Sequence, residues 1–182
     1  MYKEFLFHLL LQELSKLGLG ENTDIHSMEL PVKYSEVKKV IKIWTELQPQ
    51  LFVHIGMASS SKAITLEQCG RNKDYMEKDL SGDHPQGGCC LPEGPERIES
   101  VVNMKSVCKN LSRLGVDVIH SRDYSYYFSL YYGQGRAVFI HVPPLTTAMT
   151  AERHAQALQL IIQEILTGLF RELFAAGNDS LS

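Results

Sequence analysis

The sequence predicts an α/β domain in which a mostly parallel central sheet carries helices on both faces. Apolar runs of strand length alternate along the chain with stretches that have helical spacing, which is the pattern of this class. Two of these runs, residues 51–57 and 137–142, are almost continuously apolar, as expected for strands covered on both faces. The chain has 182 residues, so we expect residues 1–182 to form a single domain.

The N-terminal stretch is expected to form a helix followed by a short strand. Residues 2–17 are amphipathic and end at Gly18 or Gly20, two residues suited to a left-handed helix end. The charges near the start and the lack of a small-residue cleavage site argue against a signal peptide. Residues 25–30 then read as a strand that Pro31 ends.

The middle of the chain is expected to hold a helix, two strands and a long loop. Residues 35–47 carry apolar side chains at helical spacing, with Ser35 as the expected N-cap. The strand at 51–57 follows, and a second strand is expected at residues 62–68. Residues 69–95 are rich in Gly, Asp, Asn and Pro without periodicity, and a loop of this length is usually functional or disordered.

The last part of the chain repeats the alternation of helix and strand. The final helix is expected from residue 151 to residue 174, with Thr150 as N-cap and a frayed polar tail from residue 177. The other expected elements are a helix at residues 104–114, a buried strand at 116–120 and a strand at 137–142.

The composition excludes several classes of protein. The net charge of −3 and the scattered basic residues give no electrostatic footprint for nucleic acid. No window approaches the length of about 18 apolar residues that a membrane span needs. The cysteines are too few and too unevenly spaced for a disulfide framework or a structural zinc site, which favours free thiols and a cytoplasmic location. They are Cys69, Cys89, Cys90 and Cys108.

Two polar residues lie at the ends of predicted strands, where α/β sheets gather their functional side chains. His141 could act as a general base, or it could be a half-buried histidine that donates to a backbone carbonyl. Glu67 could orient a histidine, or it could be a solvated residue at the rim of the sheet. The residue pattern alone leaves both alternatives open.

Several motifs resemble the pyroglutamyl-peptidase I family of cysteine peptidases, over roughly residues 10–166. They occur in the family's order, which makes the resemblance specific. The motifs are Glu13-Leu14-Ser15-Lys16-Leu17-Gly18-Leu19-Gly20, Gln48-Pro49-Gln50-Leu51-Phe52-Val53-His54-Ile55-Gly56-Met57, Leu66-Glu67-Gln68-Cys69-Gly70-Arg71-Asn72-Lys73, Gly94-Pro95-Glu96-Arg97-Ile98-Glu99-Ser100, Val107-Cys108-Lys109 and Phe139-Ile140-His141-Val142-Pro143-Pro144-Leu145.

The resemblance implies removal of an N-terminal pyroglutamate from peptides by a Cys–His–Glu triad, without a cofactor or a metal. By motif, the histidine corresponds to His141 and the glutamate to Glu67. In such a triad a thiolate attacks the amide carbonyl, the histidine moves the proton and the glutamate holds the imidazole.

The chain departs from the family pattern at two places. The family carries its nucleophile in an Asp-Ala-Gly-Arg-Tyr-x-Cys motif before a tyrosine-rich helix, whereas this chain passes directly from Asp123 to Tyr124. The nucleophilic cysteine is therefore expected to be absent. The family also begins with a strand and a Gly-Phe-Gly-Pro-Phe turn, and this chain starts at the first helix, so we expect the sheet to lack its first strand.

These departures predict a catalytically inactive member of the lineage, a pseudoenzyme that retains Glu67 and His141. The alternative is a non-catalytic paralogue that binds pyroglutamyl peptides or a protein through the 69–95 loop or a cluster of tyrosines. Replacement of the thiol by Ser121 or Ser125, and a metal site built on His120, Glu67 and His141, are weaker readings. The tyrosines are Tyr124, Tyr126, Tyr127, Tyr131 and Tyr132. The sequence leaves the oligomeric state open.

Overall fold

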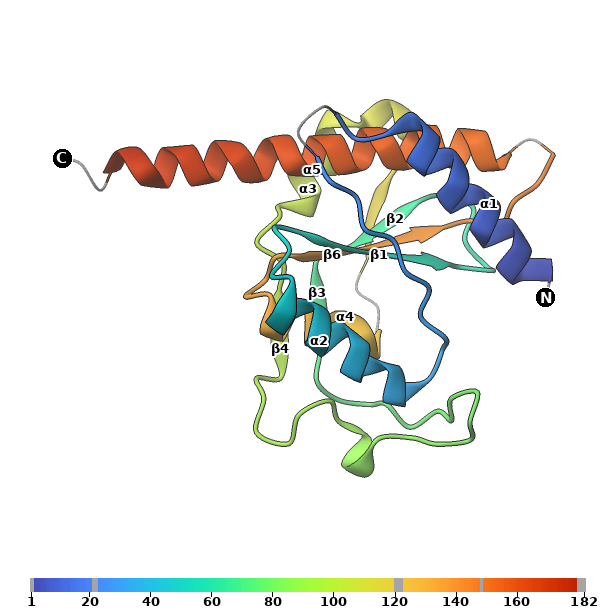
Figure 1. Cartoon of the computed structure of the whole chain (residues 1–182), viewed down its shortest axis with the longest axis vertical. Coiled ribbons are helices and arrows are strands. Elements are labelled where there is room, and N and C mark those ends of the chain that lie inside the picture. Colours follow the sequence, from blue (N-terminus) through green and yellow to red (C-terminus); the bar gives the residue numbers. More distant parts are fainter. Residues whose placement is uncertain (1, 21–22, 120–122, 148, 180–182) are drawn as a thin grey trace.

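A computed structural model describes the backbone of residues 2–20, 23–119, 123–147 and 149–179, and the side chains of residues 8–171 within these ranges (Figure 1). The helices are α1 (Tyr2–Leu17), α2 (Val37–Glu46), α3 (Met104–Asn110), α4 (Tyr124–Tyr132) and α5 (Ala151–Asp179). The strands are β1 (Phe52–Met57), β2 (Thr65–Glu67), β3 (Cys69–Arg71), β4 (Arg97–Glu99), β5 (Asp117–Ile119) and β6 (Ala137–Val142).

The central sheet of the described residues has four strands in the order β1-β6-β2-β5. β1 runs parallel to β6, and β2 runs parallel to β5, whereas the two pairs meet antiparallel between β2 and β6. The expected α/β class with a mostly parallel sheet is therefore confirmed. β3 and β4 form a separate antiparallel pair.

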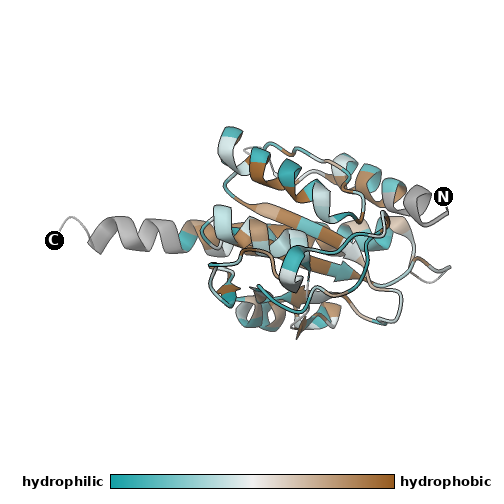
Figure 2. Cartoon of the chain, turned by 90° about the horizontal axis from the view of Figure 1, so that it is seen from below, coloured by the Kyte–Doolittle hydropathy of each residue, from teal (hydrophilic) through white to brown (hydrophobic). Residues whose placement is uncertain are grey.

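Helices cover both faces of the central sheet, and the alternation of side chains along β6 separates two apolar cores. Val138, Ile140 and Val142 face the larger core, together with buried residues of α1, α3 and α5. Ala137 and Phe139 face a smaller core formed with α2 and α4. Figure 2 shows the apolar strands in brown between the covering helices. Every residue of β6 except His141 is buried.

Several elements lie where the sequence places them. α1 covers the expected residues 2–17, and Gly18 follows it with a left-handed φ of 66°. β1 and β6 match the two apolar runs. The Thr150 hydroxyl accepts a hydrogen bond from the Arg153 N–H at 3.4 Å, as expected for an N-cap.

The prediction of a strand at residues 25–30 is wrong. This segment has no regular secondary structure, and none of the backbone hydrogen bonds between described residues involves it. A strand needs a hydrogen-bonded neighbour, and composition alone does not supply one. Ser35 is also not the cap of a helix, because it lies inside a short 3₁₀ turn, Tyr34–Glu36, that precedes α2.

The boundaries of other elements differ from the expected ones. The 69–95 stretch contains β3 and a 3₁₀ turn, Gln86–Gly88, so it is only partly irregular. α3 ends at Asn110 and a 3₁₀ turn follows, while α5 continues through Asp179 into the predicted tail. None of the helices in the described stretches is long and apolar enough to cross a membrane.

Candidate active site

The central sheet brings Glu67 and His141 together. Glu67 is the last residue of β2, and His141 is the penultimate residue of the antiparallel neighbour β6. In the register of these strands Glu67 lies opposite Phe139, so His141 is its diagonal neighbour. Diagonal residues of neighbouring strands share one face of the sheet and lie within reach of long side chains. Both side chains therefore project toward the face that α2 and α4 cover.

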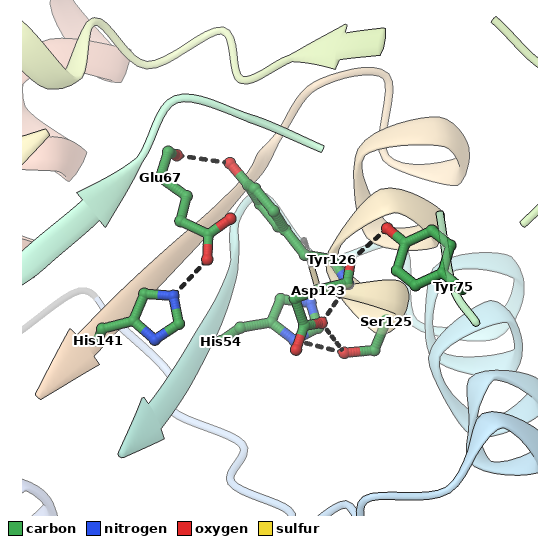
Figure 3. A network of polar contacts seen from close by, with 7 residues as sticks. All are labelled: His54, Glu67, Tyr75, Asp123, Ser125, Tyr126 and His141. Atoms are coloured by element: carbon green, nitrogen blue, oxygen red, sulfur yellow. Dashed lines mark hydrogen bonds and ion pairs between the residues drawn. The ribbon is translucent and has the colours of Figure 1, made fainter. Parts of the chain in front are cut away.

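A hydrogen bond joins the His141 Nε2 to the Glu67 Oε1 (Figure 3). The Glu67 side chain is fully buried, whereas 17% of the His141 side chain is exposed. A carboxylate that accepts from Nε2–H leaves Nδ1 as the nitrogen that can take up a proton. This is the arrangement that orients an imidazole as a general base.

Tyr126 of α4 holds the main chain of the acid in place. Its hydroxyl donates to the backbone carbonyl of Glu67 at 2.8 Å, and its ring is fully buried. Burial, together with the nearby Glu67 carboxylate, raises the pKa of Tyr126 above its usual value, so its hydroxyl remains a donor. The helix that follows Asp123 is thereby fixed directly to the candidate site.

Aromatic stacking fixes the position of the imidazole. The His141 ring stacks on Phe139 with 4.4 Å between centroids, and Phe139 stacks in turn on His54. Gly56 of β1 lies opposite His141, and a Cβ at this position would be 2.8 Å from the Phe139 ring and 3.7 Å from the His141 Nδ1. Only glycine therefore fits beside these two rings without moving them.

A second histidine, His54, lies in the same layer. Its Nε2 contacts the Ser129 hydroxyl at 2.7 Å, and its Nδ1 lies 3.4 Å from the Ser125 hydroxyl. Ser125 donates its own proton to the Asp123 carboxylate at 2.7 Å, so its oxygen can accept from His54 Nδ1–H. Burial lowers the pKa of His54 to about 4, against a smaller opposing effect of Asp123. His54 is therefore neutral near neutral pH.

The sequence pattern does not predict His54 as a site residue. The available signal was one histidine that interrupts an otherwise apolar strand. Such a pattern does not distinguish a catalytic base from a core residue, because both require a buried position with a polar partner. Its contacts favour a structural role, since two serines of α4 saturate its ring nitrogens.

Ser125, one of the two serines expected as weak substitutes for a thiol, makes its described side-chain hydrogen bonds away from the base. The hydrogen bonds of Ser125 go to Asp123 and His54. Ser121 and His120 lie outside the described residues. Among the described residues, no group of three or more His, Cys, Asp or Glu side chains could hold a metal ion.

All four cysteines fall in described parts of the chain, and none of them forms a disulfide. Cys69 is buried in β3, and the Cys90 thiol donates to the Arg71 carbonyl at 3.8 Å. Burial raises the pKa of Cys90 to about 12 and also raises the pKa of Cys108. These two thiols therefore stay protonated at neutral pH.

The geometry defines a class of protein: an α/β protein with a buried carboxylate that orients an imidazole at the end of a strand. A sequence profile of the family described as pyroglutamyl peptidase matches residues 10–177. The chain belongs to this family, whose members remove N-terminal pyroglutamate from peptides.

Two curated relatives illustrate the similarity. The pyroglutamyl-peptidase 1-like protein of Homo sapiens is 50% identical over 166 residues, which cover 86% of this chain and 85% of the relative. The pyroglutamyl-peptidase 1 of Mus musculus is 42% identical over 166 residues, which cover 86% of this chain and 79% of the relative. The resemblance described from the motifs is thus confirmed.

Solved structures confirm the fold. The pyrrolidone carboxyl peptidase from Thermococcus litoralis superposes with a TM-score of 0.75 at 18% identity, covering 90% of this chain and 88% of that one. A mutant (E192D) of the pyrrolidone carboxyl peptidase from Pyrococcus furiosus gives a TM-score of 0.73 at 21% identity, covering 87% and 90%.

Proposed function

We propose that this chain is a member of the pyroglutamyl peptidase family that keeps the base and its orienting acid but does not cleave pyroglutamyl peptides. The observation that carries the proposal is the contact between His141 and Glu67 combined with the direct passage from Asp123 to Tyr124. A covalent mechanism needs a nucleophile within hydrogen-bonding reach of the base. The chain has no cysteine at the position where the family motif carries one.

The start of α4 supports this proposal. Asp123 caps the helix by accepting from the Tyr126 N–H at 2.9 Å, so the helix begins immediately after it. The Ser125 hydroxyl, which lies in the first turn of α4, donates its hydrogen bond to Asp123. Proximity of this kind matters, because a misplacement of about 1 Å can reduce a rate about a hundredfold.

A turnover assay tests the proposal. We expect the purified protein to release no fluorophore from pyroglutamyl-aminomethylcoumarin above the rate of a blank without protein. The pyroglutamyl-peptidase 1 of Mus musculus, assayed in parallel, controls for the substrate and the buffer. Turnover that disappears in the His141→Ala variant and after alkylation of the thiols would contradict the proposal.

An insertion tests whether the gap accounts for the inactivity. A variant with the family's Ala-Gly-Arg-Tyr-x-Cys segment placed between Asp123 and Tyr124 supplies the missing thiol. The matched control carries serine in place of the inserted cysteine. Activity of the cysteine form alone would support the assignment of Glu67 and His141 as the remaining triad members.

The second candidate function is binding without turnover. Of the five tyrosines considered above, Tyr126 and Tyr127 are buried, whereas Tyr131 and Tyr132 are 44% and 38% exposed. Exposed tyrosines are enriched in interfaces, so the end of α4 offers a contact surface. A thermal shift with a pyroglutamyl peptide that the matching glutaminyl peptide does not produce would support retained recognition, and equal shifts would oppose it.

A further inference from the structure

A small cavity lies between the C-terminal half of α5 and the turn that precedes β6. It has a volume of about 280 Å³, and its apolar lining comes from Val101, Leu166, Leu169 and Phe170. Val101 is 45% exposed and Phe170 is 44% exposed, so the wall of the cavity is accessible from solvent. Apolar side chains that are exposed together around a hollow mark sites for ligands.

This cavity is separate from the candidate active site. Arg136, which lines the cavity, directly precedes β6, whereas His141 is the penultimate residue of that strand. Five residues of a strand span roughly 16 Å, so the two places lie toward opposite ends of β6. Figure 1 shows that β1 and β6 begin at the end of the sheet where α5 runs out past it. A ligand in this cavity would therefore not touch the imidazole or its carboxylate.

Of the described residues that line the cavity, Arg136 alone is charged. Its Nε donates to the Gly133 carbonyl at 3.0 Å, and its guanidinium carbon lies 5.4 Å from the centroid of the Trp44 ring. These two contacts hold the guanidinium in place. Within the described chain, no carboxylate forms an ion pair with Arg136. The terminal N–H groups of this permanent cation are therefore available to an anion.

Gln50 and Gln134 complete the polar part of the lining. Their amide groups can donate hydrogen bonds to an oxygen that the arginine holds. Gln134 has a left-handed φ of 52°, which is uncommon for a residue other than glycine. Residues held in uncommon backbone conformations cluster at ligand sites. This observation independently points to a ligand at the turn before β6.

We infer that this cavity binds a small monocarboxylate with an apolar chain. A planar guanidinium matches a carboxylate through two parallel hydrogen bonds, and its single positive charge balances the single negative one. The apolar walls then cover the chain, and burial of each CH₂ group favours binding. A volume of about 280 Å³ has room for roughly nine groups of the size of a water molecule, at about 30 Å³ each. Heptanoate, with seven carbons and two oxygens, has this size.

The test measures the binding of heptanoate to the full chain by isothermal titration calorimetry. The matched control ligand is heptanamide, which has the same number of non-hydrogen atoms and no charge. We expect saturable binding of heptanoate and at least about tenfold weaker binding of heptanamide, because the amide loses the charge-assisted pair with Arg136. From pentanoate to heptanoate, each added CH₂ group should tighten binding by up to about fourfold.

Two arginine variants locate the site. Arg136→Met removes the charge and keeps an unbranched side chain, so we expect at least about tenfold weaker binding of heptanoate. Arg171→Met removes the same charge from an exposed position of α5 outside the lining, and it should bind heptanoate as the wild-type chain does. The comparison of the two ligands on the wild-type chain remains decisive if Arg136→Met does not fold.

Four results would overturn the inference. The first is the absence of saturable binding of heptanoate to the wild-type chain. The second is equal affinity of that chain for heptanoate and heptanamide. The third is an equal loss of affinity in Arg136→Met and Arg171→Met, because a general attraction of charge would then account for the binding. The fourth is tighter binding of the peptide acetyl-Gly-Gly-Leu than of heptanoate, because the cavity would then take the C-terminus of a peptide and not a free acid.

Discussion

The pair of His141 and Glu67 couples the candidate site to the stability of the sheet. The carboxylate of Glu67 is fully buried, and the imidazole is its hydrogen-bond partner in the neighbouring strand. Hydrogen bonds to a charged group contribute more than those between neutral groups, about 1.5–3 kcal/mol. The pair therefore contributes to the stability of the sheet.

The first prediction concerns this coupling. We expect His141→Ala to lower the free energy of unfolding by about 2 kcal/mol, because the buried carboxylate loses its imidazole. The double variant His141→Ala with Glu67→Gln should be less destabilised than the sum of the single changes, by about 1 kcal/mol. Urea denaturation of the four proteins measures both quantities. Strictly additive losses would show that the two side chains do not interact.

The second prediction concerns His54, which is neutral in the folded state. Its pKa is about 4 in the fold, below the ordinary value of 6.5 that applies in the unfolded chain, so the unfolded chain binds the extra proton first as the pH falls. Stability should be complete above pH 6.5 and should decrease between pH 6.5 and pH 4, by about 3 kcal/mol at most. Urea denaturation at several pH values measures this decrease.

The variant His54→Asn provides the comparison for this effect, because it removes the titrating ring and keeps a polar side chain. We expect its stability to depend less on pH than that of the wild-type chain over the same interval. Parallel curves for the two proteins would assign the acid sensitivity to other groups.

The start of α4 links the contacts of His54 to the helix that covers the candidate site. Asp123 accepts hydrogen bonds from the Tyr126 N–H and the Ser125 hydroxyl, and Ser125 in turn contacts His54. The cap therefore orders both the helix and the polar contacts of the strand beneath it.

The third prediction tests this cap. Asp123→Ala should destabilise the protein by about 1 kcal/mol, because the first turn of α4 loses its side-chain acceptor. Asp123→Asn keeps an acceptor oxygen and should lie close to the wild-type stability, apart from a small loss of favourable charge at the helix start. Thermal unfolding monitored by circular dichroism compares the three proteins. Equal loss in both variants would assign the effect to the charge and not to the cap.

The elements that the sequence predicts well are those with long, regular patterns. β6 matches its expected residues because six consecutive positions are apolar apart from one histidine, and α1 matches because a glycine ends its pattern. β3 and β4 have three residues each, which is too short for any periodicity. At residues 25–30 the sequence predicts a strand that does not form. The composition of this segment is typical of a strand, but the segment pairs with no other strand in the described chain.

For the whole molecule, the central sheet separates a face that carries the candidate site from a face that holds the larger apolar core. Glu67, His141 and His54 lie on the face under α2 and α4, whereas the alternate residues of β6 face the core formed with α1, α3 and α5.

The candidate site could be predicted only in part from the sequence. Strand ends indicated Glu67 and His141, and the motifs favoured their pairing, which the diagonal register of β2 and β6 provides. The layer of Phe139, His54 and Gly56 around the imidazole depends on the pairing of β1 with β6, so it becomes visible only once the strands are assembled. The catalytic role of the pair remains a prediction.

The rate at which the cysteines react with iodoacetamide, followed for each residue by mass spectrometry, tests most directly whether His141 lacks a thiol to activate. An imidazole beside a thiol lowers the pKa of the thiol and accelerates alkylation near neutral pH. We expect each of the four cysteines to react no faster than a free thiol and at the same rate in the His141→Ala variant. A cysteine that reacts rapidly in the wild-type chain and slowly in His141→Ala would contradict the account.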